Sequence, residues 1–211
     1  MQVTKQEVLL VIPTFRPTRS VISIIEKLKL TTIVSDDCSP VTSDPILREI
    51  SALPRTTVIR NLHNQGIARG LNQGLEFAAS HQFEWLLTVD QDSDLDGDYA
   101  RAILSAAQSH EALWIQRPAV GVIAPHQIQD ASGVMTYPTK LVDSVPVTQE
   151  VIQSGALWRV SSLLPIGGFY LYLVIYAFFS ASFLHLLGLS LSTSRCSIHV
   201  FSTVLETSFQ Y

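Results

Sequence analysis

Several aspartates follow an apolar run near the middle of this 211-residue chain. The run Trp85-Leu-Leu-Thr-Val leads directly into Asp90-Gln-Asp92-Ser, and three more aspartates follow before residue 99. In an extended chain, residues i and i+2 point the same way about 7 Å apart, so Asp90 and Asp92 can converge on one divalent cation. A cation that bridges a diphosphate would remove the repulsion between the carboxylates and neutralise charge on a leaving phosphate. The alternative is a solvated acidic loop.

The same aspartates overlap a second metal-binding pattern. Asp92, Asp94 and Asp96, followed by Gly97, match the first half of an EF-hand calcium loop. Position 12 of that loop falls on Ile103, where a bidentate glutamate is expected, and the preceding segment has the pattern of a strand rather than a helix. A calcium-binding module is therefore the weaker of the two metal hypotheses.

Two earlier loops carry polar groups that suit a nucleotide. After the first apolar run, Thr14 offers a hydroxyl and Arg16 a fixed positive charge, in a loop shaped by Pro13. After the second run, the carboxylates of Asp36 and Asp37 can accept hydrogen bonds from a base or a ribose. A capping loop explains the first segment equally well, and an Asx turn or a helix N-cap is the favoured interpretation of the second segment taken alone.

A glycine-rich segment follows the third apolar run. Gly66, Gly70 and Gly74 are four residues apart, so on a helix they would share one face and permit close packing. Arg69 is near the expected start of this helix, where its guanidinium and the backbone N–H groups would face a phosphate. Tight packing of the helix on a sheet is the alternative explanation.

The elements that position these groups follow an α/β pattern. Short apolar or β-branched runs predict strands at residues 8–13, 32–35, 57–61, 85–90 and 120–124. Between them, the pattern predicts helices at residues 19–30, 45–53, 66–81 and 98–108. Near-continuous apolarity indicates a mostly parallel central sheet with helices on both faces. Ligands of such sheets bind at the carboxyl ends of the strands, where the polar groups above are found.

Composition excludes several classes of protein. Apolar residues make up 47% of the chain, charged residues 15%, and the net charge is −4, which argues against disorder and against an electrostatic nucleic-acid binder. Cys38 and Cys196 are far apart and belong to no metal-ligand cluster. The amino-terminal apolar run is short and is broken by Pro13, which is not typical of a signal peptide. We therefore expect a cytoplasmic location.

The composition changes near residue 169. Residues 170–211 carry only two of the charged residues, Arg195 and Glu206. Residues 169–191 are apolar over a length that can span a bilayer as a helix. Three interpretations of this tail stay open: a membrane anchor, a buried helix, or translation out of frame.

Six segments, taken in order, resemble the family-2 glycosyltransferases: VIPTFRP, VSDDCSP, RNLHNQGIARGLNQG, LLTVDQDS, VGVIAPH and QSGALWRVSSLLPIGGF. The resemblance covers about residues 7–169. It implies a GT-A fold and inverting transfer of a sugar from a nucleoside-diphosphate sugar to a hydroxyl of a glycan or lipid-linked acceptor. The DQDS form most resembles bacterial rhamnosyltransferases, which implies dTDP-rhamnose as donor and polysaccharide assembly at the cytoplasmic face of the inner membrane.

The resemblance also implies roles for individual residues. Asp90 and Asp92 would hold Mg²⁺ or Mn²⁺ against the diphosphate, and Ser154 and Gly155 would shape the side of the donor sugar and the acceptor. The residues expected along the base, ribose and phosphates are Pro13, Thr14, Arg16, Asp36, Asp37, Asn64, Gly66 and Arg69.

The catalytic base of this family is not found at its usual place. It normally lies in an acidic segment after the GGF element, but Phe169 is followed by the apolar tail, and the next carboxylate is Glu206. We therefore expect a transferase domain over residues 1–169 and a tail over residues 170–211 that comes from a frameshifted or truncated gene. The alternative function is a nucleotide-sugar-binding remnant without catalysis.

Overall fold

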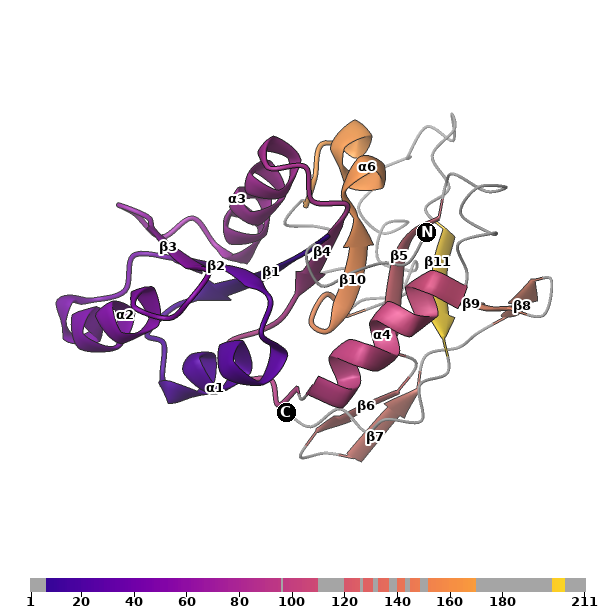
Figure 1. Cartoon of the computed structure of the whole chain (residues 1–211), viewed down its shortest axis with the longest axis horizontal. Helices are drawn as coiled ribbons and strands as arrows, with labels where there is room; N and C mark the ends of the chain where they lie inside the picture. Colours follow the sequence, from indigo (N-terminus) through magenta and orange to yellow (C-terminus); the bar gives the residue numbers. More distant parts are fainter. Residues whose placement is uncertain are drawn as a thin grey trace, which may run out of the picture.

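The computed structural model of the chain describes residues 7–95, 97–109, 120–125, 127–130, 133–136, 140–142, 145–148, 152–169 and 199–203. Within these ranges, the largest sheet has the strand order β3-β2-β1-β4-β10-β5-β11-β9-β8 (Figure 1). Its first four strands run parallel to one another: β3 (Thr56–Arg60), β2 (Thr31–Asp36), β1 (Val8–Thr14) and β4 (Trp85–Thr88). The predicted parallel arrangement is confirmed for these strands.

The other half of the sheet has mixed directions. The strand β10 (Ala156–Arg159) is antiparallel to both β4 and β5 (Val120–Pro125). Next to β5 lies β11 (His199–Thr203) in parallel, followed by β9 (Val145–Thr148) and β8 (Lys140–Val142) in antiparallel pairing. A separate antiparallel pair consists of β6 (Gln127–Asp130) and β7 (Gly133–Thr136).

Helices cover both faces of the parallel half, as predicted. They are α1 (Arg19–Leu28), α2 (Asp44–Ser51), α3 (Ile67–Ser80), α4 (Gly97–Ser109) and the single turn α6 (Val160–Leu163), with 3₁₀ turns η1 (Val41–Ser43) and η2 (Leu164–Ile166). Side chains alternate across β1, so Leu10 packs in the core cluster of α1 and α4 and Leu9 packs in the cluster of α3 and α6. Figure 1 shows α3 and α6 on the opposite side of the sheet from α1 and α4.

The helix α3 packs unusually close to the sheet. A Cβ atom added at Gly70 would approach Pro13 Cβ at 3.0 Å, and one added at Gly74 would overlap the side chain of Val11. Gly66 differs, because its φ is +81° and a Cβ there would meet no heavy atom within 4 Å. Thus Gly70 and Gly74 permit the close approach, whereas Gly66 supplies the backbone conformation that precedes the helix.

Two expectations about the sheet need correction. The strand predicted over residues 85–90 ends at Thr88, and Ser93 N donates a hydrogen bond to Asp90 O at 3.2 Å, so Asp90 and Asp92 lie in a turn rather than in an extended chain. Backbone pairing stops here because Asp90 N bonds to the hydroxyl of Ser154 at 2.8 Å instead of to a neighbouring strand. The central strand β10 was not predicted.

No helix within the described ranges is long and apolar enough to cross a bilayer. The segment predicted to span a membrane, residues 169–191, lies outside the described residues except for Phe169.

Candidate functional site

Strand direction brings the predicted site residues to one edge of the sheet. Because β1, β2 and β4 are parallel, their carboxyl ends lie together, with Thr14 opposite Asp36 in the register of β1 and β2. The antiparallel strand β10 has its amino end at the same edge, with Ala156 opposite Thr88. The segment 152–155 that precedes β10 therefore lies at the edge where β1, β2 and β4 end, in contact with the end of β4 and the turn after it.

Asp90 is the most perturbed carboxylate of this edge. Its pKa is raised to about 6, mainly by burial and also by the negative charge of Asp92, whereas hydrogen bonds from Gln153 and Ser154 act to lower it. Gln153 Nε2 donates to Asp90 Oδ1, and the Ser154 hydroxyl accepts from Asp90 N and shares a hydrogen bond with Ser93 Oγ at 2.9 Å. Asp90 is thus oriented by buried polar neighbours.

The segment before β10 is anchored by its backbone. Gly155 N donates to Thr88 O at 2.7 Å, and Gly155 O accepts from the hydroxyl of Tyr99. Gly155 has a φ of +78°, which favours glycine. The structure therefore brings Ser154 and Gly155 next to the end of β4 that leads into Asp90.

Asp94, exposed like Asp92, has a charged partner. Asp94 Oδ1 pairs with Lys27 Nζ at 2.7 Å, and the helix α4 already begins at Gly97, which would be the sixth position of a calcium loop. An EF-hand requires a helix before its loop, but here β4 precedes it. These features weigh against the calcium-binding hypothesis.

The chemistry of the acidic turn fits a divalent cation that arrives with a ligand. Mg²⁺ is commonly bound by one or two carboxylates together with substrate phosphates. Burial and the negative charge of Asp92 disfavour the ionised form of the Asp90 carboxyl group. A cation beside the two side chains would favour that ionised form. Within the ranges that the structure describes, no three or more His, Cys, Asp or Glu residues form a group that could hold a metal ion.

Asp36 is enclosed by the protein itself. Its side chain is fully buried, and its carboxylate accepts from Ser39 N at 3.1 Å, bonds to the Ser39 hydroxyl and lies 3.4 Å from Arg60 Nε. Arg60 also contacts Asp44 Oδ1 at 2.6 Å, and this hydrogen bond is the largest factor that raises the pKa of Arg60. The carboxylate of Asp36 therefore joins the loop after β2 to the last residue of β3.

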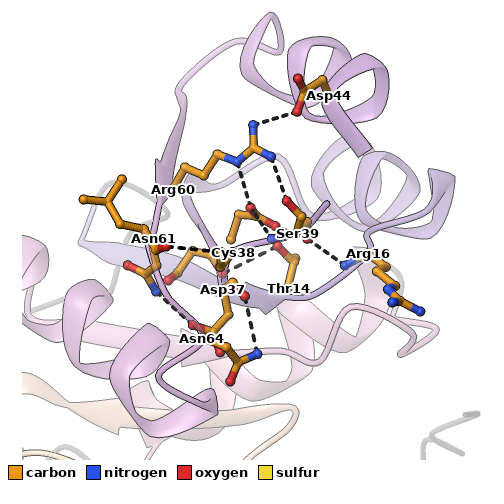
Figure 2. Close-up of polar contacts among 12 residues, drawn as sticks. Thr14, Arg16, Asp37, Cys38, Ser39, Asp44, Arg60, Asn61 and Asn64 are labelled. Carbon is orange, nitrogen blue, oxygen red and sulfur yellow. Dashed lines mark hydrogen bonds and ion pairs between the residues drawn. The ribbon is translucent and has the colours of Figure 1, made fainter. Parts of the chain in front are cut away.

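Asp37 organises the loop that leads into α3. Its Oδ1 accepts from Gln65 N at 2.8 Å and from Asn61 Nδ2 at 3.2 Å, and its Oδ2 accepts from Gly66 N at 2.8 Å. Its backbone carbonyl accepts from Asn64 Nδ2 at 3.4 Å, and Figure 2 shows Asn64 beside Asp37. Asn64 and Gly66 are therefore both bonded to Asp37. The predicted pair of aspartates thus divides between two structural environments.

The loop after β1 is tied to its neighbours. Thr14 is buried, its hydroxyl lies 3.5 Å from Ser35 O, and its carbonyl accepts from Asp37 N at 2.8 Å. Arg16 N donates to Ser39 Oγ at 2.7 Å, and the guanidinium of Arg16 lies 5.1 Å from the ring centre of the half-exposed Phe15. Arg16 therefore remains at the surface beside the site.

Arg69 has a partner within its own helix. Its Nη1 lies 2.9 Å from Glu76 Oε1, and both side chains are at least 40% exposed. Because exposed ion pairs contribute little free energy, Arg69 can leave Glu76 for another negatively charged partner at a small cost.

Sequence reasoning missed the amide side chains that hold this edge together. Gln153 orients Asp90, Gln73 bridges Ser35 Oγ at 2.5 Å and Asn61 Oδ1 at 2.7 Å, and Gln91 bonds to the backbone after β1. The available sequence signal for Gln91 was its place between two aspartates, whereas Gln73 lies on the same predicted helix as Gly70 and Gly74.

One protein family matches the part of the chain that forms this edge. The profile of Glycosyl transferase family 2 matches residues 11–156, more than half of the chain. A comparison with curated protein sequences gives no significant match.

Two solved glycosyltransferase structures are similar in fold. S. aureus TarS, residues 1–349 in complex with UDP-GlcNAc, has a TM-score of 0.63 at 13% identity, with 97% of this chain and 58% of that chain covered. The mannosyltransferase PcManGT from Pyrobaculum calidifontis, in complex with GDP-Man and Mn²⁺, has a TM-score of 0.59 at 14% identity, with coverage of 97% and 56%. The chain thus spans just over half the length of each of these two structures. With the family profile, these findings show that the chain has the GT-A fold and belongs to glycosyltransferase family 2.

Proposed function

We propose that this edge of the sheet binds a nucleoside-diphosphate sugar together with Mg²⁺ or Mn²⁺, and that the chain transfers the sugar with inversion to an acceptor hydroxyl. The observation that carries the proposal is the partly buried, hydrogen-bonded Asp90 beside the exposed Asp92, at the point where β1, β2, β4 and β10 converge. A bound cation would neutralise charge that develops on the departing diphosphate. The protein's own part is to hold both carboxylates toward that group.

The remaining predicted residues would contact different parts of the nucleoside-diphosphate sugar. Thr14 is the last residue of β1, and Asp37 and Asn64 lie on the loops after β2 and β3, which suits the base and the ribose. Gly66 and Arg69 are at the start of α3, where N–H groups and a guanidinium favour phosphate. Pro13, Arg16 and Asp36 would shape these loops, and Ser154 and Gly155 would border the donor sugar and the acceptor.

The donor and acceptor follow from the sequence resemblance. The DQDS form of residues 90–93 supports dTDP-rhamnose as donor and a glycan or lipid-linked acceptor of surface-polysaccharide assembly, at the cytoplasmic face of the inner membrane. Structural neighbours bound to UDP-GlcNAc and to GDP-Man with Mn²⁺ support a nucleoside-diphosphate sugar as the ligand class. UDP, dTDP and GDP are therefore the probes to compare.

The metal role is tested with two neighbouring exposed aspartates. Titration calorimetry with UDP, dTDP and GDP, with and without Mn²⁺, should show Mn²⁺-dependent binding that Asp92→Asn weakens at least about tenfold. Asp94→Asn is the matched control, because Asp94 pairs with Lys27, and it should bind within about twofold of the parent. Equal binding by parent and Asp92→Asn would reject the metal site.

A second candidate function is binding without transfer. No carboxylate occurs between Phe169 and Glu206, where the family resemblance expects the catalytic base. A chain whose tail is out of frame would bind the donor and release no product in a radiolabelled-sugar transfer assay. Sequencing the coding DNA around codon 169 distinguishes an out-of-frame tail from a genuine one. An alternative reading frame with an acidic continuation would favour a binding remnant without catalysis. The absence of such a frame would favour a genuine tail, with membrane association through residues 169–191.

A further inference from the structure

The side chain of Gln91 pairs with the backbone of Phe15 as a neighbouring strand would. Its Oε1 accepts from Phe15 N at 3.1 Å, and its Nε2 donates to Phe15 O at 3.1 Å. On the other side, the carbonyl of Gln91 accepts from the hydroxyl of Ser20 at 2.6 Å. Three hydrogen bonds therefore connect the residue between Asp90 and Asp92 to the loop and helix that follow β1.

These bonds begin where backbone pairing between β1 and β4 stops. The register of the two strands ends at Val11 opposite Thr88, and Val89 N still donates to Val11 O at 3.1 Å. Farther along, Thr14 bonds through its carbonyl to Asp37 N at 2.8 Å, on the side of β2. Of the three bonds at Gln91, two come from its side chain, and the bond from Ser20 goes to its backbone carbonyl.

The pairing requires a carboxamide of this length. An amide offers one donor and one acceptor in the spacing of a peptide group, so it can satisfy both polar groups of Phe15. Glutamate would lack the donor, asparagine is one methylene shorter, and methionine has similar length with neither strong group.

We propose that Gln91 is a positioning residue that fixes the turn at residues 90–92 against the loop at residues 14–16. The inference rests on the proposed function, in which Asp90 and Asp92 face the cation and Thr14 borders the nucleoside. With the two segments held at one separation, both ends of a single ligand can be bound together. Without the side chain of Gln91, each end of the ligand can still bind to its own segment. Binding of one end then no longer holds the other segment in the position that the second end requires.

The test measures how much Mn²⁺ improves nucleotide binding. The gain is the ratio of Kd without Mn²⁺ to Kd with Mn²⁺, taken for whichever of UDP, dTDP and GDP the full unmodified chain binds most tightly. Gln91→Met should lower the gain about tenfold and change the metal-free Kd less than about twofold. Gln91→Asn keeps a polar amide and should also lower the gain. It serves as the test if Gln91→Met does not fold. Gln82→Met, before the opposite end of β4, is the control and should keep the gain.

Hydrogen exchange of the ligand-free chain tests the contact itself. The amide of Phe15 should exchange at least about tenfold faster in Gln91→Met, whereas the amide of Asp37, bonded to Thr14 O, should keep its rate. Faster exchange with an unchanged gain would overturn the positioning role, and unchanged exchange would overturn the contact. If the unmodified chain shows no gain with Mn²⁺, the proposed function fails and the inference fails with it.

Discussion

At the scale of single residues, Asp90 combines partial burial with a charge that the proposed cation binding requires. Burial raises its pKa from 3.8 to about 6, so the ionised group costs free energy in the ligand-free protein at neutral pH. Gln153 and Ser154 offset part of this cost through hydrogen bonds. A carboxylate kept in such a place at the edge of the sheet is typical of a binding site.

Replacing this carboxylate should stabilise the ligand-free protein. The folded state holds the proton of Asp90 more tightly than the unfolded state, so stability falls as pH rises from 3.8 to about 6 and is level above. Asp90→Asn removes this loss and should raise the free energy of unfolding at pH 7 by about 1–3 kcal/mol, with a much smaller difference near pH 4. Urea unfolding at both pH values without metal checks this, and a variant less stable than the parent at pH 7 would contradict it.

Roles of single residues were only partly predictable. The acidic turn and the Asp36–Asp37 pair were recognisable by type and spacing. The sequence did not show that Asp36 would be enclosed by Ser39 and Arg60 while Asp37 holds the loop before α3, because the two adjacent carboxylates differ only in their tertiary surroundings. The amide of Gln91 was missed for the same reason.

At the scale of elements, local patterns predicted the parallel half well. The predicted and observed ends of α1 to α4 and of β1 to β3 agree within two residues, since apolar periodicity and turn residues mark them directly. The strand β10 escaped prediction because it is short and its place depends on pairing with the distant strands β4 and β5. The strand β4 also ends within two residues of its predicted end, but these two residues include Asp90, whose N–H bonds to Ser154, 64 residues away.

The close approach of α3 to the sheet gives a stability prediction. A Cβ at Gly74 would overlap Val11 in β1, so Gly74→Ala should destabilise the protein by about 1–3 kcal/mol despite the better helix propensity of alanine. Thermal or urea unfolding measures this. In the double variant with Val11→Ala, the cost should be less than the sum of the two single costs, and simple additivity would contradict the packing explanation.

At the scale of the whole molecule, the site exists because strands of opposite direction share one edge. Parallel strands β1, β2 and β4 contribute their carboxyl ends, and antiparallel β10 contributes the loop that orients Asp90 (Figure 1). The family profile covers residues 11–156, and so includes all these parts except the first three residues of β1 and the last three of β10. We therefore expect donor binding to depend on this part of the chain, and transfer to an acceptor to depend also on the residues after Phe169.

In the proposed function, Mn²⁺ and a nucleoside diphosphate bind together at this edge. Paramagnetic broadening of amide signals in the full chain, on addition of Mn²⁺ with UDP, dTDP or GDP, locates the ion directly. We expect the amides of Gln91, Asp92, Ser93 and Ser154 to broaden first, and those of residues 82–84 at the opposite end of β4 to stay sharp. Broadening centred instead on residues 94–98, without a need for nucleotide and unaffected by Asp90→Asn, would contradict the account and favour a calcium-type site.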